Sequence, residues 1–136
     1  MAGYSKRSLA QKLGIKEGFR IAILNPPGNY TKLLGVLPSG VTADEKPEKG
    51  MDLIHCFVKD KREAARTVSA LRDKISPRGA LWVSWPKGSS GVSTDLNENV
   101  LREIGLKTGL VDVKVCAVDE TWSGLKFVYR LKNRPK

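Results

Sequence analysis

The sequence has little of what several classes of protein require. Its 136 residues include two cysteines and one histidine, His55. Cys56 and Cys116 each lie inside an apolar run, where cysteine is usually a small buried hydrophobic residue. No histidine, cysteine or carboxylate cluster has the spacing of a metal site. The sequence therefore predicts neither a disulfide framework nor a bound metal, and it predicts that His55 packs within a strand.

Long apolar runs are also absent. No run approaches the roughly 20 residues that a membrane-spanning helix needs, and the N-terminus lacks the apolar core of a secretory signal. We therefore expect a cytoplasmic protein with no membrane partner. Hydrophobic residues make up 40% of the chain and charged residues 28%, which is ordinary for a globular protein. We expect residues 1–136 to form a single domain with flexible tails at 1–8 and 132–136.

Acidic residues are outnumbered by basic ones. There are 24 Lys and Arg against 14 Asp and Glu, which gives a formal net charge of +10. Such an excess favours polyanionic partners such as nucleic acid. The basic residues are spread along most of the chain, with one cluster at 59–66 and another at 126–136. Charge alone therefore leaves nucleic-acid binding open as one hypothesis.

What is present is an alternation of strands and helices. Apolar or alternating runs predict strands at 19–24, 41–43, 52–58, 80–85, 110–118 and 125–131. Apolar periodicity and capping signals predict helices at 8–14, 30–35, 61–75 and 95–109. We expect Ser8 and Asp95 to cap the first and last helices, and the last strand to lie at an edge of the sheet. The sequence predicts a three-layer α/β Rossmann-like sandwich, whose mostly parallel sheet is closed by an antiparallel β-hairpin.

Four segments in this order resemble a known family. The segment 13-LGIKEGFRIAIL-24 is similar to the "LxxxxGxRV" opening of class I S-adenosylmethionine-dependent methyltransferases. The segments 52-DLIHCFV-58 and 77-PRGALWVSW-85 are similar to that family's fourth and fifth strands, and 109-GLVDVKV-115 to its sixth. The resemblance implies a methyltransferase-like topology with a shortened N-terminal half. Through "LWVSWPK…SGV.TDL" and "DVKVCAVDETWSGLKFV" the chain also resembles a small bacterial family of unknown function, which implies no activity.

The chain departs from the methyltransferase pattern where that family binds its cofactor. The family ends its first strand in a Gly-rich loop, whereas this chain has Asn25-Pro26-Pro27-Gly28, and its two prolines have no N–H to donate. The family's acidic residue for the ribose hydroxyls follows the second strand, and here Asp44 and Glu45 fall in a Pro-rich loop. We therefore expect no cofactor, with S-adenosylmethionine as the candidate if one binds.

Ligands of open α/β sheets bind beyond the carboxyl ends of the strands. Tyr30, Trp85 and Trp122 are expected as apolar walls there, with the two tryptophans forming a crevice. The loop 87-KGSSG-91 either holds an anion at a helix N-terminus or merely connects two elements. The candidate ligand-binding residues are Asn25, Gly28, Tyr30, Lys59, Ser84, Trp85, Lys87, Ser89, Ser90, Asp119, Glu120 and Trp122.

Three hypotheses about function follow. The favoured one is a non-catalytic Rossmann-like protein that binds a small ligand or a protein partner at the carboxyl ends of its strands. No catalytic residue is predicted, because a single histidine with no spaced partner defines no catalytic arrangement. The first alternative is a minimal S-adenosylmethionine- or nucleotide-dependent enzyme. The second is a basic nucleic-acid-binding accessory protein.

Overall fold

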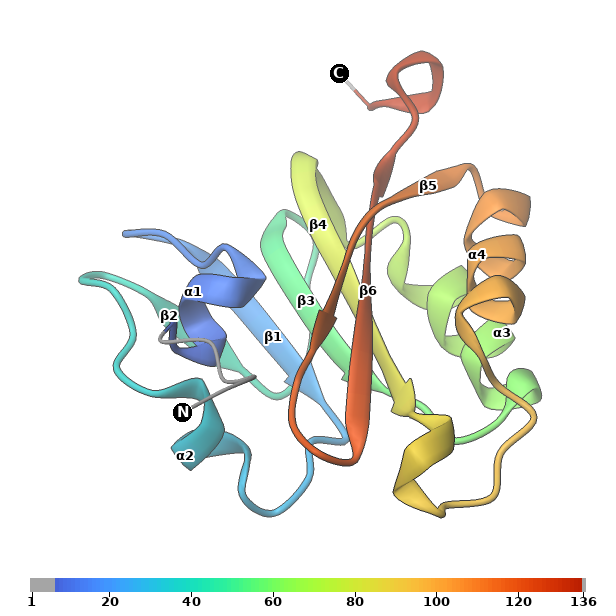
Figure 1. The fold of residues 1–136 in the computed structure, drawn as a ribbon. Coiled ribbons are helices and arrows are strands. Elements are labelled where there is room, and N and C mark those ends of the chain that lie inside the picture. The colour runs from blue at the N-terminus through green and yellow to red at the C-terminus, as the bar shows by residue number, and fades with distance from the viewer. Residues whose placement is uncertain (1–6, 136) are drawn as a thin grey trace.

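A six-stranded sheet with helices on both faces forms the centre of the molecule (Figure 1). The computed structural model describes residues 7–135. The strands are β1 (Arg20–Leu24), β2 (Thr42–Asp44), β3 (Met51–Phe57), β4 (Ile75–Pro86), β5 (Leu110–Ala117) and β6 (Trp122–Tyr129). The helices are α1 (Leu9–Leu13), α2 (Tyr30–Leu34), α3 (Lys61–Leu71) and α4 (Glu98–Lys107), and short 3-10 helices occupy Gly88–Ser90 and Leu131–Asn133.

The strand order is β2-β1-β3-β4-β6-β5. The strands from β1 to β4 run parallel, and β6 is antiparallel to both of its neighbours, β4 and β5. The carboxyl ends of the parallel strands therefore meet along one edge of the sheet, at the bottom of Figure 1. The predicted parallel sheet closed by an antiparallel hairpin is confirmed.

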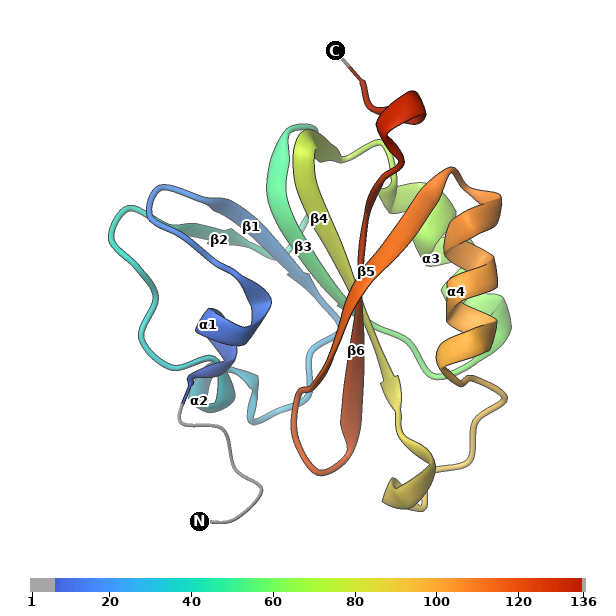
Figure 2. The ribbon, with the colours of Figure 1, turned by 45° about the horizontal axis from the view of Figure 1, so that its top comes forward.

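The two faces of the sheet bury separate cores. Side chains of α3 and α4 pack in one core, which includes Ile54 and Cys56 of β3. Side chains of α1 and α2 pack in the other, which includes Leu53 and Phe57 of the same strand. Because β3 is buried on both faces, its sequence is a nearly continuous apolar run. Figure 2 shows the resulting layers, with α3 and α4 on the side away from α1.

Local signals define both ends of α1. The Ser8 side chain accepts a hydrogen bond from the Gln11 backbone N–H, and the Gln11 side chain accepts one from the Ser8 N–H. Gly14 ends the helix in the left-handed conformation, with φ of 84°. Residues 1–6 and 136 of the expected tails lie outside the described residues. Among residues 7–135, no helix is long and apolar enough to cross a bilayer.

The helix expected over 61–75 is shorter than predicted. It ends at Leu71, and Ile75 instead begins β4, where it pairs with Met51 of β3. The register shifts between Met51 and Leu53, so β4 accommodates Pro77 at an irregularity of the ladder. Gly79 is required there, because a Cβ atom at that position would lie 2.8 Å from the Met51 carbonyl oxygen.

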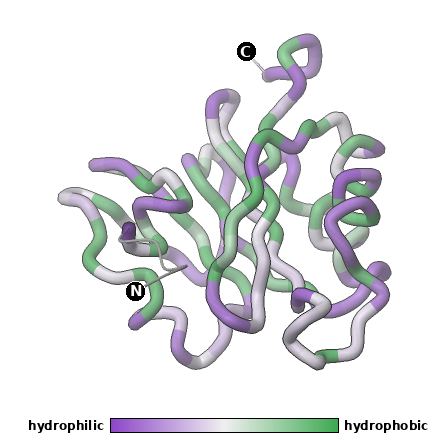
Figure 3. Tube along the Cα trace, viewed as in Figure 1, coloured by the Kyte–Doolittle hydropathy of each residue, from purple (hydrophilic) through white to green (hydrophobic). Residues whose placement is uncertain are grey.

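The expected cap of the last helix was also wrong. Asn97 caps α4 by accepting a hydrogen bond from the Val100 N–H at 2.9 Å. Asp95 instead accepts one from the N–H of Lys61, the first residue of α3, at 2.7 Å. Hydrophobic and hydrophilic residues alternate along α4 in Figure 3, as the apolar periodicity predicts.

The last strand does not lie at an edge of the sheet. β6 lies between β4 and β5, and its Leu125 and Phe127 are buried. The edge strand at this end of the sheet is β5, whose Val113 and Val115 are 55% and 50% exposed. Alternation of apolar and polar residues indicates that one face of a strand is buried and the other is exposed to solvent. It does not indicate whether the strand is hydrogen-bonded to one neighbouring strand or to two.

Candidate ligand-binding site

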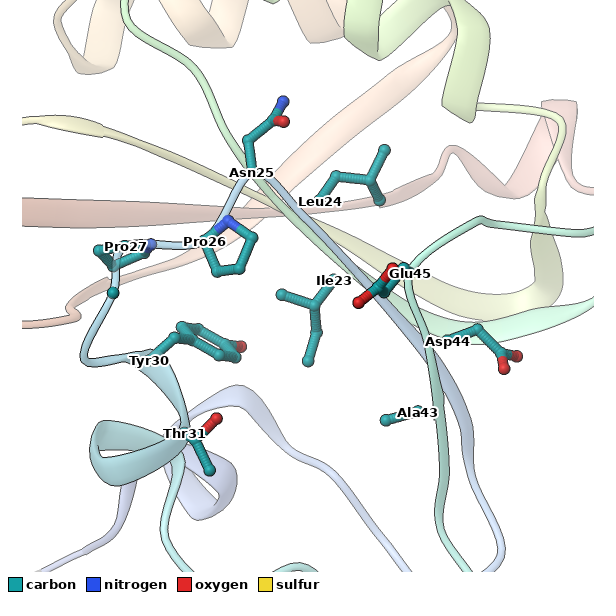
Figure 4. Close-up of a pocket in the computed structure, with 11 residues that line it drawn as sticks. Ile23, Leu24, Asn25, Pro26, Pro27, Tyr30, Thr31, Ala43, Asp44 and Glu45 are labelled. Atoms are coloured by element: carbon teal, nitrogen blue, oxygen red, sulfur yellow. The ribbon is translucent and has the colours of Figure 1, made fainter.

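A cavity of about 660 Å³ lies beyond the carboxyl ends of β1 and β2 (Figure 4). It is lined by residues 23–28, by Tyr30 and Thr31 of α2, and by residues 43–45. Small-molecule sites are typically about 300–1,000 Å³. The cavity therefore has a size suited to a small ligand, and it includes three predicted site residues, Asn25, Gly28 and Tyr30.

The turn after β1 shapes one wall of this cavity. Asn25 has φ of 56°, and it is the one non-glycine residue with positive φ among the described residues. Asn tolerates this region better than most side chains. Pro26 and Pro27 then fix the next two φ angles, and the Tyr30 N–H donates to the Pro27 carbonyl at 3.0 Å. The turn is thus held in one shape.

The opposite wall carries two carboxylates. Asp44 is the last residue of β2 and so belongs to a strand, not to the loop in which it was expected. Glu45 follows it, and both side chains are exposed. In Figure 4 the Glu45 carboxylate lies toward Ile23 and the cavity, whereas that of Asp44 points away from it. Glu45 is therefore the acceptor that a ligand in this cavity would meet.

Behind the cavity lies a buried chain of three polar side chains. The Tyr30 hydroxyl lies 2.7 Å from His55 Nδ1, and His55 Nε2 lies 2.7 Å from Ser84 Oγ. His55 and Ser84 are fully buried. Burial lowers the pKa of His55 to about 3 and raises that of the Tyr30 hydroxyl. The imidazole is therefore neutral at physiological pH, and one of its nitrogens donates while the other accepts.

This chain of hydrogen bonds ties α2 to the centre of the sheet. Tyr30 comes from α2, His55 from β3 and Ser84 from β4. The histidine was predicted to pack within a strand, and it does, but the predicted site did not include it. Its partners lie 25 and 29 residues away in sequence, so local spacing carried no sign of them.

A second, smaller cavity of about 270 Å³ shares Asn25 with the first. Its other lining residues are Phe57, Lys59, Glu63 and Trp122. The Lys59 N–H donates to Glu63 Oε1 at 2.7 Å, which fixes the backbone after β3. The rings of Phe57 and Trp122 meet edge to face, with centroids 5.0 Å apart. Two further predicted site residues, Lys59 and Trp122, thus lie together here.

Trp85 does not join Trp122 in a crevice. Trp85 packs in the core beneath α3 and α4, whereas Trp122 packs in the core on the other face of the sheet. In the β4–β6 ladder Trp85 pairs with Ser123, the residue next to Trp122. Adjacent residues of a strand point to opposite faces, so the two indole rings are separated by the sheet.

The loop 87–91 lies away from both cavities described above. Its Ser90 hydroxyl donates to the Lys87 carbonyl at 2.6 Å within a short 3-10 turn. Lys87 is half-buried and Ser89 is exposed. Because α4 begins only at Glu98, the loop does not reach the N-terminus of that helix. Residues 87–91 form part of the connection between β4 and α4.

The two acidic candidates of the hairpin also lie outside both cavities. Asp119 Oδ1 accepts hydrogen bonds from the N–H groups of Thr121 and Trp122, both at 2.8 Å. This carboxylate therefore holds the β5–β6 turn. The neighbouring Glu120 is exposed. The predicted site thus divides into cavity residues, hairpin and loop residues, and the buried Ser84 and Trp85.

Comparisons with known proteins identify the fold. The chain matches no protein-family model and no curated protein. It is similar to an S-adenosylmethionine-dependent methyltransferase from Aquifex aeolicus, with 14% identity over 88% of this chain and 86% of that chain, at a TM-score of 0.60. It is similar to Aeropyrum pernix fibrillarin in complex with natively bound S-adenosyl-L-methionine, with 17% identity, 85% and 69% coverage and a TM-score of 0.61.

A third similar structure is a possible exported protein from Bordetella parapertussis, with 13% identity, 88% coverage of this chain, 65% of that chain and a TM-score of 0.63. Likeness at these identities shows the fold alone. The predicted methyltransferase-like Rossmann fold is confirmed, and the resemblance of this shortened chain to class I methyltransferases holds in three dimensions.

Proposed function

We propose that this chain binds a small adenosine-containing ligand in the cavity beyond β1 and β2, and that it is a binding protein, not a catalyst. The observation that carries the proposal is the cavity itself, about 660 Å³ at the carboxyl ends of two parallel strands. Open α/β sheets hold their ligands at this edge. The similar fibrillarin structure contains S-adenosyl-L-methionine, so S-adenosylmethionine and S-adenosylhomocysteine are the first ligands to test.

The donors and acceptors of the cavity fit one end of such a ligand better than the other. The Glu45 carboxylate can accept hydrogen bonds from the two ribose hydroxyls, and Ile23, Pro26 and Ala43 offer apolar contacts to a purine. The amino-acid end of S-adenosylmethionine needs N–H donors for its carboxylate, and two residues of the turn are prolines. Recognition is therefore expected to rest on the adenosine end.

The groups that catalysis would use are engaged elsewhere, which supports a binding role. Both ring nitrogens of His55 are hydrogen-bonded, and burial keeps the ring neutral. Asp119 holds the hairpin through two backbone N–H groups. Neither group lines the cavity beyond β1 and β2.

Calorimetric titration of the purified protein with S-adenosylhomocysteine and 5′-methylthioadenosine tests the proposal. We expect both to bind with similar affinity, because they share the adenosine end. Glu45→Gln should weaken both about tenfold or more, since a hydrogen bond to a charged group contributes about 1.5–3 kcal/mol. Asp44→Asn removes the same charge from the adjacent residue. Because the Asp44 carboxylate points away from the cavity, this variant should keep nearly the wild-type affinity. Absence of binding by the wild-type protein, or equal losses in the two variants, would contradict the proposal.

Methyl transfer is the second candidate function, and the smaller cavity favours it. That cavity shares Asn25 with the first and places Lys59 and Trp122 beside it. A methyl acceptor there would lie next to a cofactor in the larger cavity. The test is release of S-adenosylhomocysteine from S-adenosylmethionine in the presence of fractionated cell extract. Turnover above that of a Glu45→Gln control would replace the binding role with an enzymatic one.

A further inference from the structure

On the face of the sheet that α1 covers, strands β5 and β6 carry a pair of lysines. In the β5–β6 ladder Lys114 lies directly opposite Lys126, so both side chains project from the same face. Lys126 also pairs with the buried Trp82 of β4, which places the lysines on the α1 side. In Figure 1 α1 lies over β1, and on this side of the sheet no helix of residues 7–135 covers β5 and β6, whereas α4 packs on the opposite face.

Two more lysines come from α1 and the segment after it. Lys12 Nζ donates to the Ala117 carbonyl at the end of β5, at 3.4 Å. Lys126 Nζ lies near Gly14, within 3.9 Å of where a Cβ atom would stand. Partial burial lowers the pKa of Lys126, and the charges of Lys114 and Lys16 lower it further. Lys12, Lys16, Lys114 and Lys126 are called the basic face below.

No carboxylate neutralises these lysines in the part of the chain from 7 to 135. The four ion pairs found there all involve arginines, namely Arg20, Arg72 and Arg102. Like charges directly opposite each other on neighbouring strands destabilise a sheet. Local features that oppose stability are typical of functional sites. The missing counter-charge is therefore one that a partner would supply.

We propose that the basic face binds the phosphate backbone of a nucleic acid. A duplex carries closely spaced phosphates along its whole length, which matches several lysines gathered on one face. The net charge of +10 attracts the same partner at longer range. A membrane surface fits less well, because Trp and Phe anchor interfacial segments and none of the exposed large apolar residues between 7 and 135 is a Trp or Phe. The basic face would bind nucleic acid whether or not the cavity beyond β1 and β2 binds adenosine.

Fluorescence anisotropy of a labelled 20-base-pair DNA duplex, titrated with protein at several NaCl concentrations, tests the inference. The test variant is Lys114→Gln with Lys126→Gln. The matched control is Lys46→Gln with Lys49→Gln, which removes the same charge from positions between β2 and β3. Each phosphate contact contributes about 0.9 to the slope of log K against log[salt]. We expect the test variant to bind more weakly and to lose about 1.8 from that slope, while the control keeps the wild-type slope.

Three outcomes would overturn the inference. One is no binding of the duplex by the wild-type protein at low salt. Another is an equal loss in the test and control variants, which would make binding a property of net charge alone. The third is binding to vesicles containing phosphatidylserine but not to the duplex. Thermal melting verifies that the test variant is folded, and its melting temperature should equal or exceed that of the wild type because a repulsion has been removed.

Discussion

The β2–β1 region and the β3–β4 region of the sheet differ in how many of their residues are buried. β2 has three residues, all exposed, and β1 has five. By contrast, β3 and β4 have seven and 12 residues, and most of them are buried. The well-packed side supplies apolar burial, the main favourable term in folding. The cavity lies beyond the short strands β1 and β2, so a sparsely buried region of the sheet is the one open to a ligand.

Two side chains join these regions. Trp82 of β4 is fully buried, and its Nε1 donates to the Leu13 carbonyl of α1 at 2.9 Å. His55 of β3 links Tyr30 beside the cavity to Ser84 in the packed side. If these two residues are the connection, changes to them should affect stability far more than changes to the cavity turn.

The largest effect is expected at Trp82. Trp82→Ala removes a large buried side chain and should lower the free energy of unfolding by about 3–5 kcal/mol. Trp82→Phe keeps most of the apolar volume but leaves the Leu13 carbonyl without its partner, and should cost about 1–3 kcal/mol. Urea unfolding followed by circular dichroism measures both. A loss below about 1 kcal/mol for the alanine variant would show that Trp82 does not join the two regions.

The next effect is a pH dependence from His55. The pKa of this imidazole is about 3 in the folded protein, against an ordinary value of 6.5, so the unfolded chain takes up a proton that the native protein does not. The His55 contribution to stability is therefore constant above pH 6.5 and falls as the pH drops from 6.5 toward 3. The loss between pH 7 and pH 5 should be about 2 kcal/mol.

His55→Gln isolates that pH dependence from the titration of carboxylates. The variant should be less stable than the wild type at pH 7, because a buried hydrogen-bonded side chain is replaced. The difference between the two proteins should shrink by about 2 kcal/mol by pH 5, as measured by urea unfolding at each pH. A constant difference across this range would mean that His55 is not buried in its neutral form.

The smallest change in stability is expected for glycine-to-alanine substitutions. One in each region gives the most direct comparison of their packing. A Cβ atom at Gly105 of α4 would stand 2.1 Å from Cε1 of Phe127, whereas one at Gly28 of the cavity turn would meet nothing within 4 Å. Overpacking costs about 1–3 kcal/mol, and better helix propensity offsets up to about 1 kcal/mol of that. Gly105→Ala should therefore lower the melting temperature clearly.

Gly28→Ala should change the free energy of unfolding by no more than about 0.5 kcal/mol, as surface substitutions usually do. Thermal melting of the two variants side by side measures the contrast. Equal losses would show that the turn beside the cavity is as tightly packed as α4, and the comparison between the two regions would fail.

Much of the architecture was predictable because its causes are local. The apolar run at 52–58 predicts a strand buried on both faces, and β3 is one. Ser8, Gln11 and Gly14 define α1 through hydrogen bonds between residues at most four apart. The turn 25–28 was correctly placed at the end of the first strand.

The candidate site was less predictable because it depends on contacts between distant residues. The carboxyl ends of β1 and β2 bring Asn25 and Glu45 to one cavity. The two sides of the sheet keep Trp85 and Trp122 apart. A pattern along the chain places residues in loops, but it does not show which loops enclose a volume.

The sequence by itself determined the order of the elements and the parallel sheet closed by a hairpin, because periodicity, turn residues and caps act over a few residues. Only the tertiary structure decided that β6 lies inside the sheet, that His55 links Tyr30 to Ser84, and that Lys114 faces Lys126. Each of these is a pairing between residues far apart in the chain. Strand register and packing fix such pairings, and no local spacing encodes them.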